Sequence, residues 1–160
     1  MNLHLRGHVA VVCGSARGIG KAIANAFAAE GCRLALIDRD EQVHGVARDV
    51  TDGDAVAVAA ARIKAGLGRI DHVVFAAAVG SGKFGFPFWR LTPQDWPRVF
   101  AVNVMGAVHV AHAFAPYLVE ARSGTMLFLA SVAGQIGSQT DPPYSASKAA
   151  LINFAQCAAR

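Results

Sequence analysis

Short apolar runs that alternate with longer segments of helical period constrain the fold of this chain most. The apolar runs cover residues 8–14, 33–38, 71–77 and 124–131, and the helical segments cover residues 20–31, 52–68 and 92–121. A strand that is buried on both faces reads as a continuous apolar run. Strands that alternate with helices form a parallel sheet with right-handed crossovers. We therefore predict a single α/β domain over residues 1–160.

The composition is typical of a folded domain of ordinary size. Of the 160 residues, 54% are hydrophobic and 16% are charged, so the chain can bury a core. Its apolar runs are broken by Gly, Arg or His before they reach the roughly 20 residues that cross a bilayer, which predicts no membrane span. The N-terminal residues show no convincing signal-peptide cleavage site. We expect a soluble, cytoplasmic protein.

Charge and cysteine usage exclude several other classes. The net charge is +4, but the fifteen Lys and Arg residues are scattered singly, which argues against a nucleic-acid partner. Cys13, Cys32 and Cys157 are widely spaced and form no CxxC motif, so they predict neither a disulfide framework nor a zinc site. His109 and His112 lie three apart in a helical segment and could share a metal, although packed or surface histidines fit their apolar surroundings better. We predict no metal site.

A glycine-rich turn, GSARGIG, follows the first apolar run and opens the first helical segment. Glycines at such a turn allow the backbone to approach a dinucleotide closely, and the helix N-terminus attracts its pyrophosphate. The strand, turn and helix occur in the required order. An ordinary glycine-rich turn remains the alternative, because the chain contains sixteen Gly residues. The candidate cofactor-binding residues of the turn are Gly14, Ser15, Arg17, Gly18, Ile19 and Gly20.

The second apolar run ends in Asp38, eighteen residues after Gly20. A carboxylate at this place can accept hydrogen bonds from the ribose hydroxyls of NAD and would repel the additional phosphate of NADP. Arg17 and Arg39 lie near enough to bind that phosphate, or they are simply solvated charges. We predict NAD in preference to NADP, because an unpaired carboxylate that faces a phosphate is the costlier arrangement.

Tyr144 and Lys148 stand four residues apart in PPYSASKAAL, at the start of a helical segment. Residues at this spacing share a helix face, although a chance pairing is the alternative. A tyrosine has a pKa of about 10, but an ammonium group about 4 Å away would favour the phenolate by roughly 4 kcal/mol at an effective dielectric constant of 20. This would lower the pKa by about three units and suit Tyr144 to exchange protons near neutral pH.

Together these residues resemble the short-chain dehydrogenase/reductase family across essentially the whole chain. The shared features are GxxxGxG at Gly14, Gly18 and Gly20, the strand-ending Asp38, DVTD at 49–52, VNVMG at 102–106, Ser131, and YxxxK at Tyr144 and Lys148. The resemblance implies a Rossmann-type, doubly wound parallel sheet in three layers. It also implies an NAD(P)-dependent enzyme that interconverts a secondary alcohol and a ketone.

The resemblance also implies roles for individual residues. Tyr144 would exchange the proton of the substrate oxygen, Ser131 would hydrogen-bond that oxygen, Lys148 would hold the nicotinamide ribose, and Asn103 would position a water in the proton relay. Taken alone, Ser131 could equally cap a strand end and Asn103 could mark a helix kink. Further cofactor contacts are implied for Asp49, Val50, Ala76 and Ala77.

The sequence departs from the family in three places. The usual NNAG is replaced by FAAA at 75–78, which removes two Asn side chains. Only residues 39–43 link Asp38 to His44, although parallel neighbours need a crossover of about a dozen residues. Either the usual second helix is absent or part of the chain is missing. The family's last two strands and substrate loop would follow residue 160, so we expect the N-terminal, catalytic portion of an incomplete enzyme, with its C-terminal strands lacking.

The sequence leaves two classes of function open, and the resemblance implies an assembly. The alternative to the oxidoreductase is a non-catalytic dinucleotide-binding or scaffold protein of the same fold. The resemblance implies a homo-oligomer, a dimer or tetramer, built through the helices at 95–120 and after Pro143. The aromatic residues of segment 84–89 either wall an apolar substrate pocket or form a subunit contact, and the sequence favours neither decisively.

Overall fold

The computed structural model describes residues 3–40, 46–47, 49–137 and 141–160, and it contains a five-stranded parallel sheet. The strands follow the order β3-β2-β1-β4-β5 across the sheet. All four predicted strands are confirmed, and a two-residue strand joins them. Their bounds are β1 Val9–Cys13, β2 Arg33–Asp38, β3 Val46–Ala47, β4 His72–Phe75 and β5 Thr125–Phe128.

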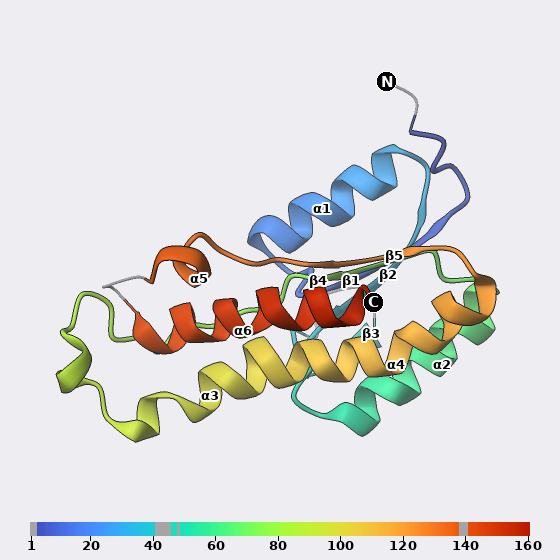
Figure 1. Cartoon of the computed structure of the whole chain (residues 1–160). Helices are drawn as coiled ribbons and strands as arrows, with labels where there is room; N and C mark the ends of the chain where they lie inside the picture. The colour runs from blue at the N-terminus through green and yellow to red at the C-terminus, as the bar shows by residue number, and fades with distance from the viewer. Residues whose placement is uncertain (1–2, 41–45, 48, 138–140) are drawn as a thin grey trace.

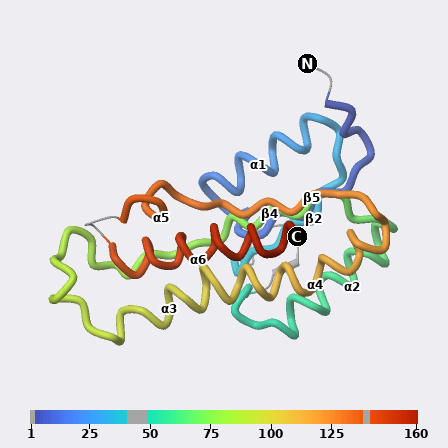
Figure 2. Tube along the Cα trace, viewed as in Figure 1, coloured from blue at the N-terminus to red at the C-terminus, as the bar shows by residue number. Residues whose placement is uncertain are grey.

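Helices cover both faces of this sheet, which confirms the predicted three layers (Figure 1). α1 lies on one face, and α2, α4 and α6 lie on the other, as the Cα trace also shows (Figure 2). The α-helices are α1 Gly18–Ala29, α2 Gly53–Leu67, α3 Pro97–Phe100, α4 Gly106–Ala121, α5 Ala133–Ile136 and α6 Pro142–Ala158. Two short 3₁₀ turns, η1 Phe88–Arg90 and η2 Pro93–Asp95, precede α3.

The segment predicted as one helix over 92–121 is divided into several pieces. Pro93 and Pro97 each occupy the first position of a short helical turn, where a residue without an N–H group is tolerated. A π-helical turn, η3 Ala101–Met105, then joins α3 to α4. In it the Gly106 N–H group bonds back to the carbonyl of Ala101, five residues earlier. The apolar period of the sequence gave no signal for this inserted turn.

Among the described residues, the same stretch is long and apolar enough to cross a membrane by length and composition only. Within the 29 residues of Pro93–Ala121, an 18-residue window has a mean hydropathy of 1.4. In the structure, Val110 and Phe114 of α4 are fully buried in the core that the helix shares with the sheet. Packing within the domain thus buries part of the apolar window, 39% of it.

Two hydrophobic cores fill the spaces between the layers. β1 is the central strand and is completely buried, as its continuous apolar sequence indicated. On one face, Val12 and Val74 pack with Ala24 of α1. On the other face, the larger core includes Phe75, Phe114 and Leu151 and lies under α2, α4 and α6. Leu127 lies on β5, an edge strand of the sheet, and is half-exposed.

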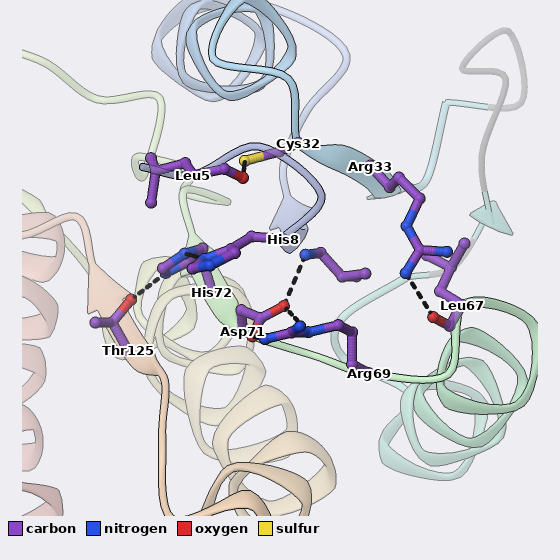
Figure 3. A network of polar contacts seen from close by, with 10 residues as sticks. Leu5, His8, Cys32, Arg33, Leu67, Arg69, Asp71, His72 and Thr125 are labelled. Atoms are coloured by element: carbon purple, nitrogen blue, oxygen red, sulfur yellow. Dashed lines mark hydrogen bonds and ion pairs between the residues drawn. The ribbon is translucent and has the colours of Figure 1, made fainter. Parts of the chain in front are cut away.

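A polar network fastens the N-terminal ends of β1 and β4 (Figure 3). Asp71 accepts a hydrogen bond from the Val9 N–H group at 2.8 Å and pairs with Arg69. Burial opposes ionisation of Asp71, but the Arg69 and Val9 hydrogen bonds outweigh it and lower the pKa of this carboxyl. Beside it, His8 Nδ1 lies 3.0 Å from His72 Nε2, with the two rings stacked. This network holds the register of the strands at the end remote from the glycine turn.

The link between β2 and β3 is as short as the sequence suggested. Ile37 pairs with Val46, and Asp38 with Ala47, in parallel register. Residues 39–45 form the whole connection, and residues 41–45 lie outside the described part of the chain. A parallel pair is thus formed across a link shorter than the usual crossover.

Candidate active site

A crevice of about 290 Å³ opens at the carboxyl ends of the strands. It lies where the strand order reverses between β1 and β4, the place at which open α/β sheets bind ligands. Eleven of the predicted cofactor-binding or catalytic residues line it: Gly14, Arg17, Ile19, Gly20, Asp38, Asp49, Val50, Ala76, Ala77, Tyr144 and Lys148. Segments that are far apart in the sequence therefore meet at one site.

Two glycines of the turn, Gly14 and Gly20, are packed so closely that neither could carry a side chain. A Cβ atom on Gly14 would lie 2.5 Å from the backbone nitrogen of Ala77, and Gly14 has a φ of +84°. A Cβ atom on Gly20 would lie 2.0 Å from the Gly14 carbonyl oxygen. These two glycines thus allow the β1–α1 turn, α1 and the end of β4 to converge.

The turn also offers donors that suit an anion. The Arg17 side chain makes no capping hydrogen bond to α1, and the first turn of that helix contains no acidic residue. Ser15 is 4% exposed, and its Oγ atom has no hydrogen-bond partner among the described residues. A buried hydroxyl without a partner, beside an uncapped helix N-terminus, fits the pyrophosphate of a dinucleotide.

Asp38 braces the glycine turn from β2. Its Oδ2 atom accepts a hydrogen bond from the Ala16 N–H group at 2.9 Å, and Oδ1 accepts one from the Asp40 N–H group at 3.1 Å. The exposed residues Arg17 and Arg39 line the crevice with it, so both signs of charge are present there. Burial, followed by the charge of Asp38, raises the pKa of the Cys13 thiol to about 12, so this residue stays neutral.

The remaining walls come from two loops. Asp49 folds back on its own loop, where Oδ1 accepts hydrogen bonds from the Thr51 N–H and hydroxyl groups, both at 2.9 Å. The carbonyl oxygen of Val50 lies 2.9 Å from His109 Nδ1, so this histidine of α4 joins α4 to the wall. Ala76 and Ala77, from the FAAA stretch, supply only backbone and methyl groups to the crevice.

Tyr144 and Lys148 lie on one face of α6 and contact each other in the crevice. Lys148 Nζ is 5.6 Å from the centroid of the Tyr144 ring and donates a hydrogen bond to the Leu129 carbonyl at 2.5 Å. Lys148 is only 2% exposed, and this burial lowers its pKa to about 8. At neutral pH the amine is therefore mostly protonated, and burial of this charge destabilises the folded state.

Asn103 sits in the π turn and is fully buried behind the crevice rather than lining it. Its Oδ1 atom accepts from the Val79 N–H group at 2.8 Å, and its Nδ2 group donates to the Val79 carbonyl and to Ser147 Oγ, each at 2.9 Å. The side-chain amide thus ties the loop after β4 to α6. This geometry is that of a structural clamp, and the water-positioning role of Asn103 stays a prediction.

The other predicted residues that do not line the crevice are Ser15, Gly18 and Ser131. Ser131 follows β5, and its Oγ atom accepts a hydrogen bond from the Ala133 N–H group at 3.2 Å, at the start of α5. The sequence also allowed Ser131 to act as a capping residue, and this hydrogen bond is of that kind. The Ser131 hydroxyl proton remains available for a second bond.

Several lining residues were not predicted as cofactor contacts. Ala78, Val79, Val102, Leu129 and Ala130 reach the crevice from the loop after β4, the π turn and the end of β5. They carry no polar side chain that could have marked them. The aromatic segment 84–89 does not line the crevice; Phe84, Phe88 and Trp89 are exposed on the surface.

Comparison with known proteins agrees with this geometry. Residues 8–160 match the family model described as short chain dehydrogenase. The chain is 35% identical to 2-dehydro-3-deoxy-L-rhamnonate dehydrogenase (NAD(+)) from Sphingomonas sp. strain SKA58, over 92% of this chain and 63% of that protein. It therefore spans less than two thirds of that relative's length.

Two solved structures share the fold closely. A metagenomic short-chain oxidoreductase in complex with NADP is 33% identical, with a TM-score of 0.86 over 96% of this chain and 75% of its own. NAD⁺-bound xylitol dehydrogenase is 30% identical, with a TM-score of 0.88 over 96% of this chain and 64% of its own. The matched sequence, the Rossmann-like sheet and the glycine turn place this chain in the short-chain dehydrogenase family.

Proposed function

We propose that this protein is an NAD(P)-dependent oxidoreductase that interconverts a secondary alcohol and a ketone. One observation carries the proposal: Tyr144 and Lys148 open into the same crevice as the glycine turn and Asp38. A proton-exchanging pair and a dinucleotide cradle are thus adjacent. The relatives and the ligands named for the solved neighbours support the same class.

The residues of the chain would divide the work as follows. When bound, the nicotinamide ring supplies or accepts the hydride. Tyr144 gives its phenolic proton to the carbonyl oxygen during reduction, or takes the hydroxyl proton during oxidation. Lys148, held by the Leu129 carbonyl beside the Tyr144 ring, would bind the ribose. The Ser131 hydroxyl would donate a hydrogen bond to the substrate oxygen and keep its own proton.

We propose NAD as the preferred cofactor. Asp38 lies in the crevice at the end of β2, where the adenosine ribose of a bound dinucleotide is held in this fold. Its carboxylate is already oriented by the Ala16 N–H group. Arg17 and Arg39 are the features that would favour NADP. Replacing Asp38 with Ala should therefore raise affinity for NADP and lower affinity for NAD.

The proposal is tested by titrating NAD and NADP into the purified protein and then screening secondary alcohols and ketones. Binding of NAD with lower affinity for NADP, followed by turnover of at least one alcohol, is the expected result. Binding without turnover of any substrate would instead favour the non-catalytic, dinucleotide-binding alternative. Failure to bind either dinucleotide would refute both functions.

We also propose that the protein acts in the cytoplasm as a homo-oligomer assembled through α4 and α6. Met105, which directly precedes α4, is 46% exposed, and Val119 near the end of α4 is 74% exposed. All three cysteines are free thiols, as is usual in a reducing compartment. Sedimentation of a dimer or tetramer is expected; a monomer at micromolar concentration would contradict the assembly.

A further inference from the structure

Asp141 immediately precedes α6 and is 2% exposed. The sequence Asp141-Pro142-Pro143-Tyr144 gives this residue an unusual position. The two prolines have no N–H group, so the first backbone donor of α6 belongs to Tyr144. Asp141 Oδ1 accepts from that N–H group at 3.4 Å. The cap of the helix is therefore made on the residue that carries the proposed proton-exchanging phenol.

The second carboxylate oxygen of Asp141 faces a different part of the chain. Oδ2 accepts a hydrogen bond from the Ser81 N–H group at 2.9 Å, sixty residues away in sequence. Among the described residues, no Lys, Arg or His forms an ion pair with this carboxylate. Its buried charge is thus compensated by backbone N–H groups of the loop and of the helix N-terminus.

The loop is packed tightly around the carboxylate. A Cβ atom on Gly80 would lie 2.7 Å from Asp141 Oδ2 and 3.0 Å from the Phe84 ring. Even a methyl group at Gly80 would therefore displace the carboxylate or the ring. Val79, the neighbouring residue, lines the crevice and is already held by Asn103.

We propose that Asp141 is a positioning residue, whose carboxylate bridges Ser81 of the loop and Tyr144 of α6 and so fixes the phenol of Tyr144 relative to the crevice. This inference rests on the proposed function, because it assigns Tyr144 its role. The Asn103 clamp holds the loop to the side of α6, and the Asp141 bridge holds it to the first turn. A displacement of the phenol by about 1 Å can cost on the order of a hundredfold in rate.

The test distinguishes two roles of the Asp141 side chain: capping the N-terminus of α6, and bridging α6 to Ser81 of the loop. Asp141→Ser keeps a good N-cap residue, but its side chain is too short to reach Ser81. Gly80→Ala disturbs the same bridge from the loop side without altering α6. Lys83→Met is the matched control, because it removes the ion pair with Asp95 from the same loop and leaves α6 untouched.

Hydrogen exchange of peptides covering 79–84 and 142–148, without substrate, shows whether the two segments are coupled. The cofactor dissociation constant, KM and kcat are then measured on the same proteins. In both Asp141→Ser and Gly80→Ala, we expect faster exchange in both peptides and a kcat lowered by about tenfold to a hundredfold, with cofactor affinity retained. Lys83→Met should keep the wild-type kcat and the wild-type exchange of 142–148.

The proposal is overturned if exchange in Asp141→Ser rises in 142–148 alone, or if kcat falls no more than in Lys83→Met. Should Asp141→Ser fail to fold, Gly80→Ala decides by the same two measurements. If the wild-type protein oxidises no alcohol, the proposed function has failed. The exchange experiment still decides separately whether Asp141 couples the loop to α6.

Discussion

Replacing Lys148 with Met should make the protein more stable while it abolishes turnover. The pKa of Lys148 is lowered from its ordinary value of 10.5 to about 8 by burial. Because one pKa unit corresponds to about 1.4 kcal/mol, the charged amine costs the folded state about 3 kcal/mol at pH 7. Met has a similar length and no charge. It would lose the bond to the Leu129 carbonyl, worth about 1 kcal/mol.

The net expectation is a gain of about 2 kcal/mol in the free energy of unfolding at pH 7. Between pH 8 and 10.5, unfolded Lys148 still binds its proton whereas the folded residue has released it. Raising the pH through this range therefore favours the folded state of the wild type. The advantage of Lys148→Met should vanish and then become a deficit of about 1 kcal/mol, because only the lost bond to the Leu129 carbonyl remains.

Urea denaturation of both proteins from pH 7 to 10.5 measures this difference, and the comparison cancels the titration of other groups. If Lys148→Met is no more stable than the wild type at pH 7, or if the difference in stability does not change with pH, the claim that burial lowers the pKa of the Lys148 amine is refuted. Burial of the charged Lys148 amine would then not destabilise the folded protein.

Two further predictions follow from the packing and the polar network. Gly14→Ala should lower the free energy of unfolding by about 1–3 kcal/mol because of the positive φ at this position, and further because the new Cβ atom would collide with the Ala77 backbone. The variant should also lose dinucleotide binding. Wild-type stability of the variant in urea would contradict the close approach of the two segments. Burial, and then the charge of His8, lowers the pKa of His72 below its ordinary value of 6.5. As the pH falls below 6.5, the unfolded state therefore binds a proton more readily than the folded state, and the wild type should lose stability. His72→Gln should flatten this acid-side dependence in thermal melts, and an unchanged slope would contradict it.

Much of the scaffold could be predicted because its signals are local. β1 is buried on both faces, so its five residues read as one apolar run, and the glycine turn follows it directly. Asp52 directly precedes α2, as an N-cap residue does, and its side chain accepts a hydrogen bond from the Ala55 N–H group. These features depend on neighbours within a few residues, where spacing alone is informative.

The features that were missed depend on contacts between distant segments. The π turn interrupts an apolar period that the sequence shows as continuous. Leu129 reaches the crevice through its backbone, so its side chain could not identify it. Asp141 is informative only once Ser81 is seen beside it. Ser131 and Asn103 were selected by resemblance, and their observed bonds follow the structural alternatives that the sequence also allowed.

The most direct test of the account is to compare Tyr144→Phe with the wild type, measuring cofactor affinity and kcat on the same substrate. We predict that the variant binds NAD as the wild type does, because the glycine turn and Asp38 are unchanged. Its kcat should fall by at least about a hundredfold, because the proton has lost its donor. A variant that keeps the wild-type kcat would contradict the central role of Tyr144.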